Sequence, residues 1–392
     1  MGATTDHALG RNLKFFVKKE AAAGGAYGTA SQEALVGADA AKVLATTMEF
    51  TVTRNPRADA RASRSVLERV TGKQEISWSC ERYLLPAGGS TAPDIDPLIE
   101  AAMGGAFGAS VSKTYKLTDT NALPTVHMAR TANDVFREDL FGCYVEEMGI
   151  SASGGDEPRI SFSGGAFNYA LTGSATASGA GSSATALAVD SGEGVNFMVG
   201  SVVNLQSAER IVVAKTGADA ITLSSNHSWD DDAAVTPSGY TEVTAGNPLA
   251  GVVGTLTLNS VTNLPVTAFD MSLTNGNKPL SDEAFEKGTS DFIAGYRTLS
   301  GTITVRARKD ALKSLAARYV QTTATAEPTF STVALRVDLG GTTGKQVVLF
   351  LNQIELDFGG IDLPEAEEAV LNIPYTALGS SGGDEFHIAW NQ

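Results

Sequence analysis

Three short segments of this sequence resemble catalytic or ligand-binding motifs, and the first of them resembles a hydrolase motif. The segment GSSGG at residues 379–383 fits the Gly-x-Ser-x-Gly turn that exposes a nucleophilic serine. That turn requires a buried strand before the serine and a helix after it. This segment is polar and lies near the end of the sequence, so we expect no hydrolase site there.

The segment GGTTGK at residues 340–345 resembles a phosphate-binding loop. It is one residue too short, and Gln346 stands where Ser or Thr must contact magnesium. It also falls between two apolar runs that read as strands, with no helix N-terminus to hold a phosphate. We therefore predict a hairpin turn.

Metal-binding patterns are weak as well. Three consecutive aspartates, 230–232, lack the alternating acids and late Glu of a calcium-binding EF-hand loop. The four histidines are scattered without metal-ligand spacing, and no paired carboxylates or Cys–His arrangement is legible. We predict no catalytic residue, no metal and no cofactor, and hence no enzyme. The histidines are His7, His127, His227 and His387.

A cluster of arginines is a stronger indication of function than the motifs above. Five arginines fall within sixteen residues of a polar segment, with only two acids against them. A nucleic-acid patch would need stacking aromatics, which the segment lacks, and a solvated loop is the plain alternative. We favour contact with an acidic protein surface. The arginines are Arg54, Arg57, Arg61, Arg64 and Arg69.

The matching segment later in the chain is acidic. Opposite charge of this kind could set the register between stacked copies. We therefore mark both segments as candidate contacts between copies. The acids are Asp282, Glu283, Glu286 and Asp291.

The elements that would position these charges are mostly strands. Alternation predicts strands at 46–53 and 75–84, joined as a long hairpin by a polar loop. A helix follows at 93–103, with Asp94 or Asp96 as its cap and Pro97 in its first turn. A short helix is also expected within 31–45. Further strands are expected near 111–117, 125–130, 140–151 and 158–163.

The same order returns in the second half. Strands are predicted at 266–273 and 292–307, separated by a polar loop at 274–291, and a helix at 310–320. Strands at 332–338, 346–358 and 368–374 complete the series. A β unit that occurs twice without a catalytic signature favours a protein that builds surfaces and assemblies.

Four regions follow from this pattern. We expect an N-terminal arm at 1–45, a first β unit at 46–180, an inserted outer β module at 181–250 and a second β unit at 251–392. Strands are expected in the module at 195–205, 209–214 and 220–223. A linker rich in Gly, Ser and Ala, 173–186, leads into it.

Composition limits the partners. The net charge is -15, so the chain as a whole repels nucleic-acid phosphates. Two cysteines, Cys80 and Cys143, are too few for a disulfide scaffold and are expected to be buried thiols. We expect neither a signal peptide nor a transmembrane helix, and a reducing compartment.

One segment carries a family resemblance. The sequence WSCERYLLPAGG at 78–89, followed by Ala92-Pro93-Asp94 and a short apolar helix, resembles the major tail tube proteins of long-tailed bacteriophages with non-contractile tails. With the doubled unit and the inserted module, the resemblance covers most of the chain. It implies β-sandwich units with a flanking helix and a long hairpin, and no catalytic residues. Members with a doubled unit form trimers whose six units make one pseudo-hexagonal ring.

The resemblance also implies a role. Rings would stack into a hollow acidic conduit that genome DNA crosses without specific binding. Partners would be further copies of the chain and the tail terminator, tail tip or baseplate, and tape measure proteins. The chain would be assembled in the host cytoplasm and reside in the virion, without membrane insertion. Candidate lumen or interface residues are Glu49, Glu75 and Glu81.

Other readings stay open. A secreted or surface β-repeat adhesin or fibre is the main alternative, and the tube protein of a contractile injection system is a related one. The sequence alone leaves trimer against hexamer undecided.

Overall fold

The computed structural model of the protein describes most of the chain in a set of segments. These are residues 13–56, 69–86, 91–108, 114–119, 122–132, 135–241, 247–250, 254–258, 264–280, 287–308, 319–320, 329–330, 332–341, 344–357, 361–362 and 369–390.

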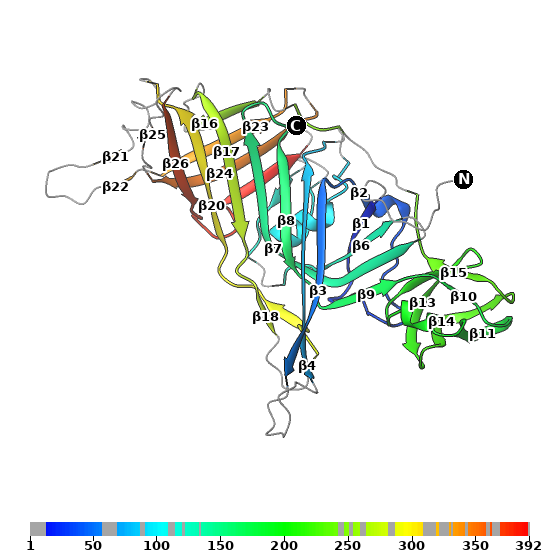
Figure 1. Ribbon diagram of the computed structural model, residues 1–392. Helices are drawn as coiled ribbons and strands as arrows, with labels where there is room; N and C mark the ends of the chain where they lie inside the picture. The colour runs from blue at the N-terminus through cyan, green and yellow to red at the C-terminus, as the bar shows by residue number, and fades with distance from the viewer. Residues whose placement is uncertain are drawn as a thin grey trace.

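The first half is built of strands around one helix (Figure 1). The strands expected at 125–130, 140–151 and 158–163 are confirmed, and both strands of the long hairpin extend further toward its tip than predicted. The strands are β1 (Leu13–Lys19), β2 (Ala40–Ala41), β3 (Ala45–Pro56), β4 (Arg69–Tyr83), β5 (Thr114–Lys116), β6 (Val126–Ala132), β7 (Phe136–Ser153), β8 (Arg159–Gly165) and β9 (Asn168–Thr172).

The helix α1 (Asp96–Met103) has Pro97 in its first turn, as predicted. Its N-cap is Ile95, and no side chain caps it, so the predicted aspartate cap is wrong. The two aspartates have other partners: Asp94 accepts a hydrogen bond from Arg82, and Asp96 accepts one from the Tyr115 hydroxyl at 2.6 Å.

The short helix expected within 31–45 is also wrong. That segment holds only a 3-10 turn, η2 (Gly37–Asp39), followed by β2. Ala40 and Ala41 pair with Phe16 and Phe15 of β1, so burial against a strand edge overrides the helical preference of an alanine-rich run.

The second half contains the strands expected at 266–273, 332–338, 346–358 and 368–374. Within the predicted loop 274–291, Lys278–Leu280 instead form a strand, β18, which pairs with β19, while residues 281–286 lie outside the described residues. The strand expected at 292–307 is divided between β19 and β20. The strands are β16 (Gly254–Leu258), β17 (Val266–Thr274), β18 (Lys278–Leu280), β19 (Asp291–Ile293), β20 (Thr298–Arg306), β23 (Val333–Leu339), β24 (Val347–Leu356), β25 (Ile361–Asp362), β26 (Val370–Ala377) and β27 (Phe386–Trp390).

The helix expected at 310–320 falls mostly outside the described residues. Its last two residues form strand β21 (Tyr319–Val320), which pairs with β22 (Thr329–Phe330), so the helix prediction is wrong there.

The strand pairings of the two halves follow the same order, and every pair is antiparallel. In the first half, β1–β6–β7–β9 form one run of neighbours and β3–β4–β8–β7 another. In the second half, the runs are β16–β23–β24–β27 and β17–β20–β26–β24. In each half, one long strand (β7 or β24) belongs to both runs.

The two halves are joined by a ladder between β7 and β17, which pairs Glu147–Ser153 with Ala268–Thr274. The run β3–β4–β8–β7 of the first half therefore joins the run β17–β20–β26–β24 of the second half. Together they form one sheet with the order β3-β4-β8-β7-β17-β20-β26-β24. After β24, the chain forms the short strand β25, which pairs with β26 in the same sheet. We call this the long sheet. Its inner face packs on the main hydrophobic core.

A separate six-stranded sheet lies beside the first half, near β9 in Figure 1, and has its own hydrophobic core. The expected linker 173–186 contains two of its strands, and residues 195–201 are not a strand. The elements are β10 (Ala175–Thr176), β11 (Gly181–Ala188), η3 (Glu193–Asn196), β12 (Val202–Leu205), β13 (Ala208–Lys215), β14 (Ala220–Trp229) and β15 (Ala234–Pro237).

Candidate functional site

The outer face of the long sheet is polar because its strands alternate. In β4, Ile76 and Trp78 are buried, whereas Glu75 and Ser77 between and beside them are exposed. The register pairs Glu49 with Ser77 and Ala45 with Glu81. The three predicted lumen candidates, Glu49, Glu75 and Glu81, therefore share this one face.

Serine and threonine are the commonest residues of this outer face and occur on it in every strand of the long sheet except β24. Side-chain hydrogen bonds tie neighbouring strands there. Among them, the Ser272 hydroxyl donates to Glu147 at 2.6 Å, and Arg159 pairs with Glu81 at 3.0 Å. The charged residues that the ladders and strand alternation place on the face are Glu49, Glu75, Glu81, Glu147, Asp270 and Glu355 against Lys73, Arg159 and Arg306.

This composition determines what the face can do. Tight nucleic-acid binding needs several Lys or Arg side chains that neutralise phosphates. Six carboxylates against three cationic side chains do the opposite, and Arg159 is already paired with Glu81. The face repels phosphate and offers hydroxyl groups to water.

Both ends of the long sheet are open edges among the described residues. At one end β3 forms a ladder with β4 alone. At the other end, the last two residues of β24, Glu355 and Leu356, form a ladder with β26 alone. The short strand β25 also pairs with β26 alone. A twelve-residue strand with a free edge readily pairs with another chain.

The structure places Arg54 and Arg69 in strands rather than in the loop where they were predicted. Arg54 lies in β3 and Arg69 in β4, both exposed near the tip of the hairpin. Arg57, Arg61 and Arg64 lie outside the described residues.

Asp291, the acidic candidate within the described residues, lies at the same end of the long sheet. Asp291 begins β19, while Asp282, Glu283 and Glu286 lie outside the described residues. The β18–β19 hairpin lies beside β4, where the Gln74 amide donates to the Lys287 carbonyl at 2.6 Å (Figure 1). The two hairpins therefore lie side by side within one chain.

The first half also holds a buried ionic cluster that sequence reasoning missed. Arg137 donates twice to Asp139, at 2.8 Å from Nη2 to Oδ1 and from Nε to Oδ2, and His127 Nε2 lies 2.9 Å from the same carboxylate. All three side chains are at most 1 % exposed. Pairing β6 with β7 would have placed His127 near Asp139, but no residue spacing marks them as a pair in the sequence.

This cluster links the first half to the segment after the six-stranded sheet. Arg137 also donates to the Ser238 carbonyl at 3.2 Å and to the Tyr240 hydroxyl at 3.1 Å, and Tyr240 donates to Glu209 of β13. Burial opposes ionisation of Asp139, but Arg137 and His127 outweigh it and hold the pKa of that carboxyl below its usual value. The cluster can fix the position of the sheet.

The chemical motifs weighed from the sequence take the form of turns. Ser380 and Ser381 lie between β26 and β27 and donate hydrogen bonds to Asp384, without a following helix. The GGTTGK segment joins the antiparallel strands β23 and β24, which confirms a hairpin turn. Within the described segments, no three His, Cys, Asp or Glu side chains gather as a metal site, and no helix there is long and apolar enough to cross a membrane.

No protein-family model matches the chain, and no curated protein matches it.

Proposed function

We propose that the protein is the subunit of a phage tail tube, in which three copies close into a ring of six units and rings stack into a conduit for DNA. The observation that supports this most is the repeated pairing order, which joins two like units into one sheet with an open edge at each end. We read these units as two tandem copies of one β-sandwich tube domain.

Ring closure follows from that repeat. Within the chain, β7 of the first unit pairs with β17 of the second through seven residue pairs. By position in the pairing order, β24 corresponds to β7 and β3 corresponds to β17. A ring of equivalent units requires each interface to be alike, so the β24 end of one copy pairs with β3 of the next. Closure then removes the free edge at each end of the long sheet.

The polar face gives such a ring its role. As the wall of the central channel, it would present hydroxyls and carboxylates to DNA. Phosphate repulsion lets the genome pass without sticking. The six-stranded sheet, at the opposite side of the first half from the long sheet's junction, is the outer module. Tape measure, tail tip and terminator proteins are the expected partners in the virion.

Cysteine cross-linking tests the closure. We would combine Thr47→Cys in β3 with Glu355→Cys in β24, which both lie on the polar face. The native cysteines are buried and will not compete. Oxidation is expected to produce covalent species that end at three chains. Each single variant serves as a control and should give no ladder.

Two results would contradict the proposal. One is a double variant that remains monomeric after oxidation at concentrations where the unmodified protein assembles. The other is a ladder that extends without limit, because that indicates an open fibre instead of a ring.

A further inference from the structure

We propose that the six-stranded sheet and the turn segment 24–32 form a cap over the outer edge of β9, and that this cap keeps a strand of a second copy from pairing there. Such a cap would act in any assembly of the chain, because the edge is covered within each copy. It gives the six-stranded sheet a role in assembly: copies cannot join through β9.

Strands β9 and β27 occupy the same position in the two halves. The ladders β6–β7 and β23–β24 each contain one bulge, and Leu140 and Leu351 are the paired residues on its amino-terminal side. Leu140 pairs with Tyr169 of β9, and Leu351 pairs with Phe386 of β27. Tyr169 therefore corresponds to Phe386, and each later residue of β9 corresponds to the next residue of β27.

In the second half, a strand of the first half covers this edge. Strand β5 pairs with β27, and the Leu117 amide, just after β5, donates to the Phe386 carbonyl at 3.5 Å. Ile388, which pairs with Tyr115, is fully buried. This position in the fold therefore accepts a strand from outside its own half.

In the first half, hydroxyl groups occupy the equivalent positions instead. The Tyr27 hydroxyl shares its hydrogen between the Tyr169 carbonyl, at 3.3 Å, and the Val199 carbonyl, at 2.6 Å. The Ser201 hydroxyl donates to the Leu171 carbonyl at 2.8 Å. Tyr27 thus bonds the carbonyl that corresponds to the one bonded by the amide after β5.

The end of the β9 edge is closed by the backbone of the six-stranded sheet, which lies beside it in Figure 1. Thr172 forms an isolated bridge with Phe197, and the Gly173 amide donates to the Asn196 carbonyl at 2.8 Å. The Val202 amide donates to the Thr172 hydroxyl at 3.2 Å. A strand from another copy would have to break these bonds before it could pair with β9.

The two parts of the cap are packed closely against each other. The buried Gln32 amide group donates to the Gly200 carbonyl at 2.9 Å. Gly200 has a φ of 89°, and a methyl group added there would lie 2.3 Å from the Tyr27 ring. The turn segment and the six-stranded sheet therefore cover β9 as one unit.

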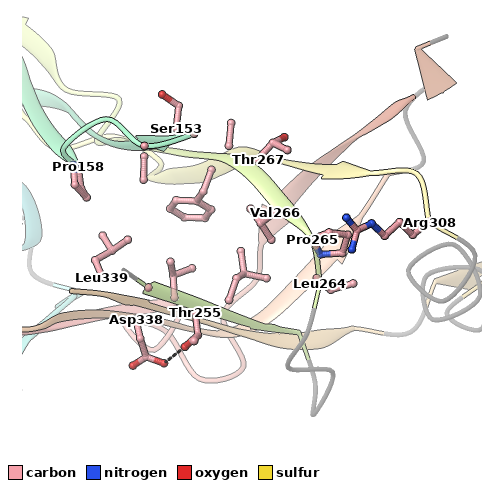
Figure 2. A pocket seen from close by; sticks show the side chains of 18 residues that line it. Ser153, Pro158, Thr255, Leu264, Pro265, Val266, Thr267, Arg308, Asp338 and Leu339 are labelled. Carbon is pink, nitrogen blue, oxygen red and sulfur yellow. Dashed lines mark hydrogen bonds between the residues drawn. The ribbon is translucent and has the colours of Figure 1, made fainter. Parts of the chain in front are cut away.

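Strand edges elsewhere in the chain lack such a cover. Among the described residues, β16 pairs with β23 alone, and a cavity of about 560 Å³ lies beside it. Figure 2 shows Thr255 and Leu339 on one side of this cavity and Ser153 and Thr267 on the other. The cover over β9 is therefore a feature of that edge and not of every edge in the fold.

An uncapped β9 would be a hazard because of Leu171. Its side chain is 39 % exposed, whereas that of its counterpart Ile388 is buried beneath β5. An open edge with an exposed apolar side chain readily pairs with another chain, and a lysine at such an edge opposes that pairing.

Opening the cap tests the proposal. We would make Tyr27→Ala with Ser201→Ala and measure association by sedimentation velocity, at a concentration where the unmodified chain is a single species. The mass in larger species is expected to rise about tenfold, because the β9 edge is then free to pair. Adding Leu171→Lys to this variant should return it to a single species.

A second variant guards against misfolding. Tyr27→Phe with Ser201→Ala removes only the two hydroxyl oxygens and should show the same change to a smaller degree, with the fold checked by circular dichroism. The matched control is Tyr296→Ala with Ser228→Ala, which should remain a single species. Tyr296 is 96 % exposed, and Ser228 accepts its hydrogen bond from Ser183 within the six-stranded sheet.

Two results would overturn the cap. One is sedimentation of both cap variants like the control variant. The other is extra association that Leu171→Lys does not reverse, because that indicates general misfolding instead of pairing at β9. Neither result depends on whether the unmodified chain forms rings at higher concentration, so a failure here is distinct from a failure of the proposed tube.

Discussion

At the residue scale, the buried cluster around Asp139 is the most constrained feature of the first half. A buried guanidinium group is tolerated only when it is paired and hydrogen-bonded. Arg137 satisfies that condition through Asp139, a carbonyl and a tyrosine hydroxyl. The cluster therefore stabilises the attachment of the module only as a complete set.

Asp139→Asn should destabilise the protein strongly, because it leaves the Arg137 charge buried without its counter-ion. The expected loss in the free energy of unfolding is about 3–5 kcal/mol, measured by urea denaturation. The partly exposed pair Arg336–Asp338 offers a control, since Asp338→Asn should cost only about 1 kcal/mol. Equal losses in both variants would contradict the role assigned to the cluster.

Stability should also fall in acid. The folded-state pKa of Asp139 lies below its usual value of about 3.9, so its contribution is present above that pH and is lost as pH falls through the folded value. The free energy of unfolding should decline below about pH 4 by up to about 1.4 kcal/mol per pH unit from this group. Asp139→Asn should remove that part of the slope, and an unchanged slope would argue against it.

At this scale, the sequence predicted which face of a strand a side chain occupies better than it predicted which side chains interact. Strand alternation placed Glu75 and Glu81 on one face of their strand, because a period of two fixes which side chains of a strand share a face, and the β3–β4 register adds Glu49 to that face. The pair His127–Asp139 depends on the register between two strands, which alternation does not specify. The aspartate cap failed because tertiary partners, Arg82 and Tyr115, hold the carboxylates elsewhere.

At the element scale, strand β7 explains how one chain forms two layers. Its amino-terminal part pairs with β6 and β9, and its carboxyl-terminal part with β8 and β17. Gly142 has a φ of 66° between these parts, and its amide donates to Glu20 at 2.9 Å. Only glycine adopts that backbone region at little cost.

Gly142→Ala should therefore destabilise the fold. A methyl group there would lie 2.2 Å from the Phe167 ring, in addition to the backbone strain. We expect a loss of about 2–4 kcal/mol in thermal or urea unfolding. Gly179 also has a positive φ, of 89°, but nothing within 4 Å of an added methyl group, so Gly179→Ala should cost only about 1 kcal/mol. Similar losses in the two variants would show that the Phe167 contact does not matter.

Element types were predictable where the pattern was long. The strands at 140–151 and 346–358 and helix α1 were visible from periodicity. Short elements failed: an alanine-rich run became β2, and the loop after β17 became the β18–β19 hairpin. Burial against β1, which is distant in the sequence, decided the outcome for β2, whereas β18 and β19 are largely exposed and pair with each other.

At the scale of the whole molecule, the ordered series of strands in each half was legible, but the pairing that joins the halves was not. The contact between Glu147–Ser153 and Ala268–Thr274 crosses the entire inserted module. The residues of neither strand indicate that the other is its pairing partner. The proposed ring extends that one internal junction to the neighbouring chain.

The proposed channel makes a prediction about DNA. Lysines at three exposed serines of the polar face, Ser77, Ser161 and Ser300, should make assembled tubes bind DNA, with an affinity that falls steeply as salt rises. Filter binding across a salt series would measure this. Lysines at exposed module positions Ser191, Thr216 and Ser225 form the control.

DNA in a narrow channel is in contact with all units at once, so the polar-face variant should show the larger salt slope. A larger slope for the module variant would show that the polar face does not line the channel.

The central claim is that this chain closes into a three-chain ring and stacks. Electron microscopy of the purified, concentrated protein tests it most directly. The account predicts hollow tubes of uniform width, built of rings with the mass of three 40.6 kDa chains. Dispersed monomers that never assemble, even with a tail-tip nucleus, would contradict it.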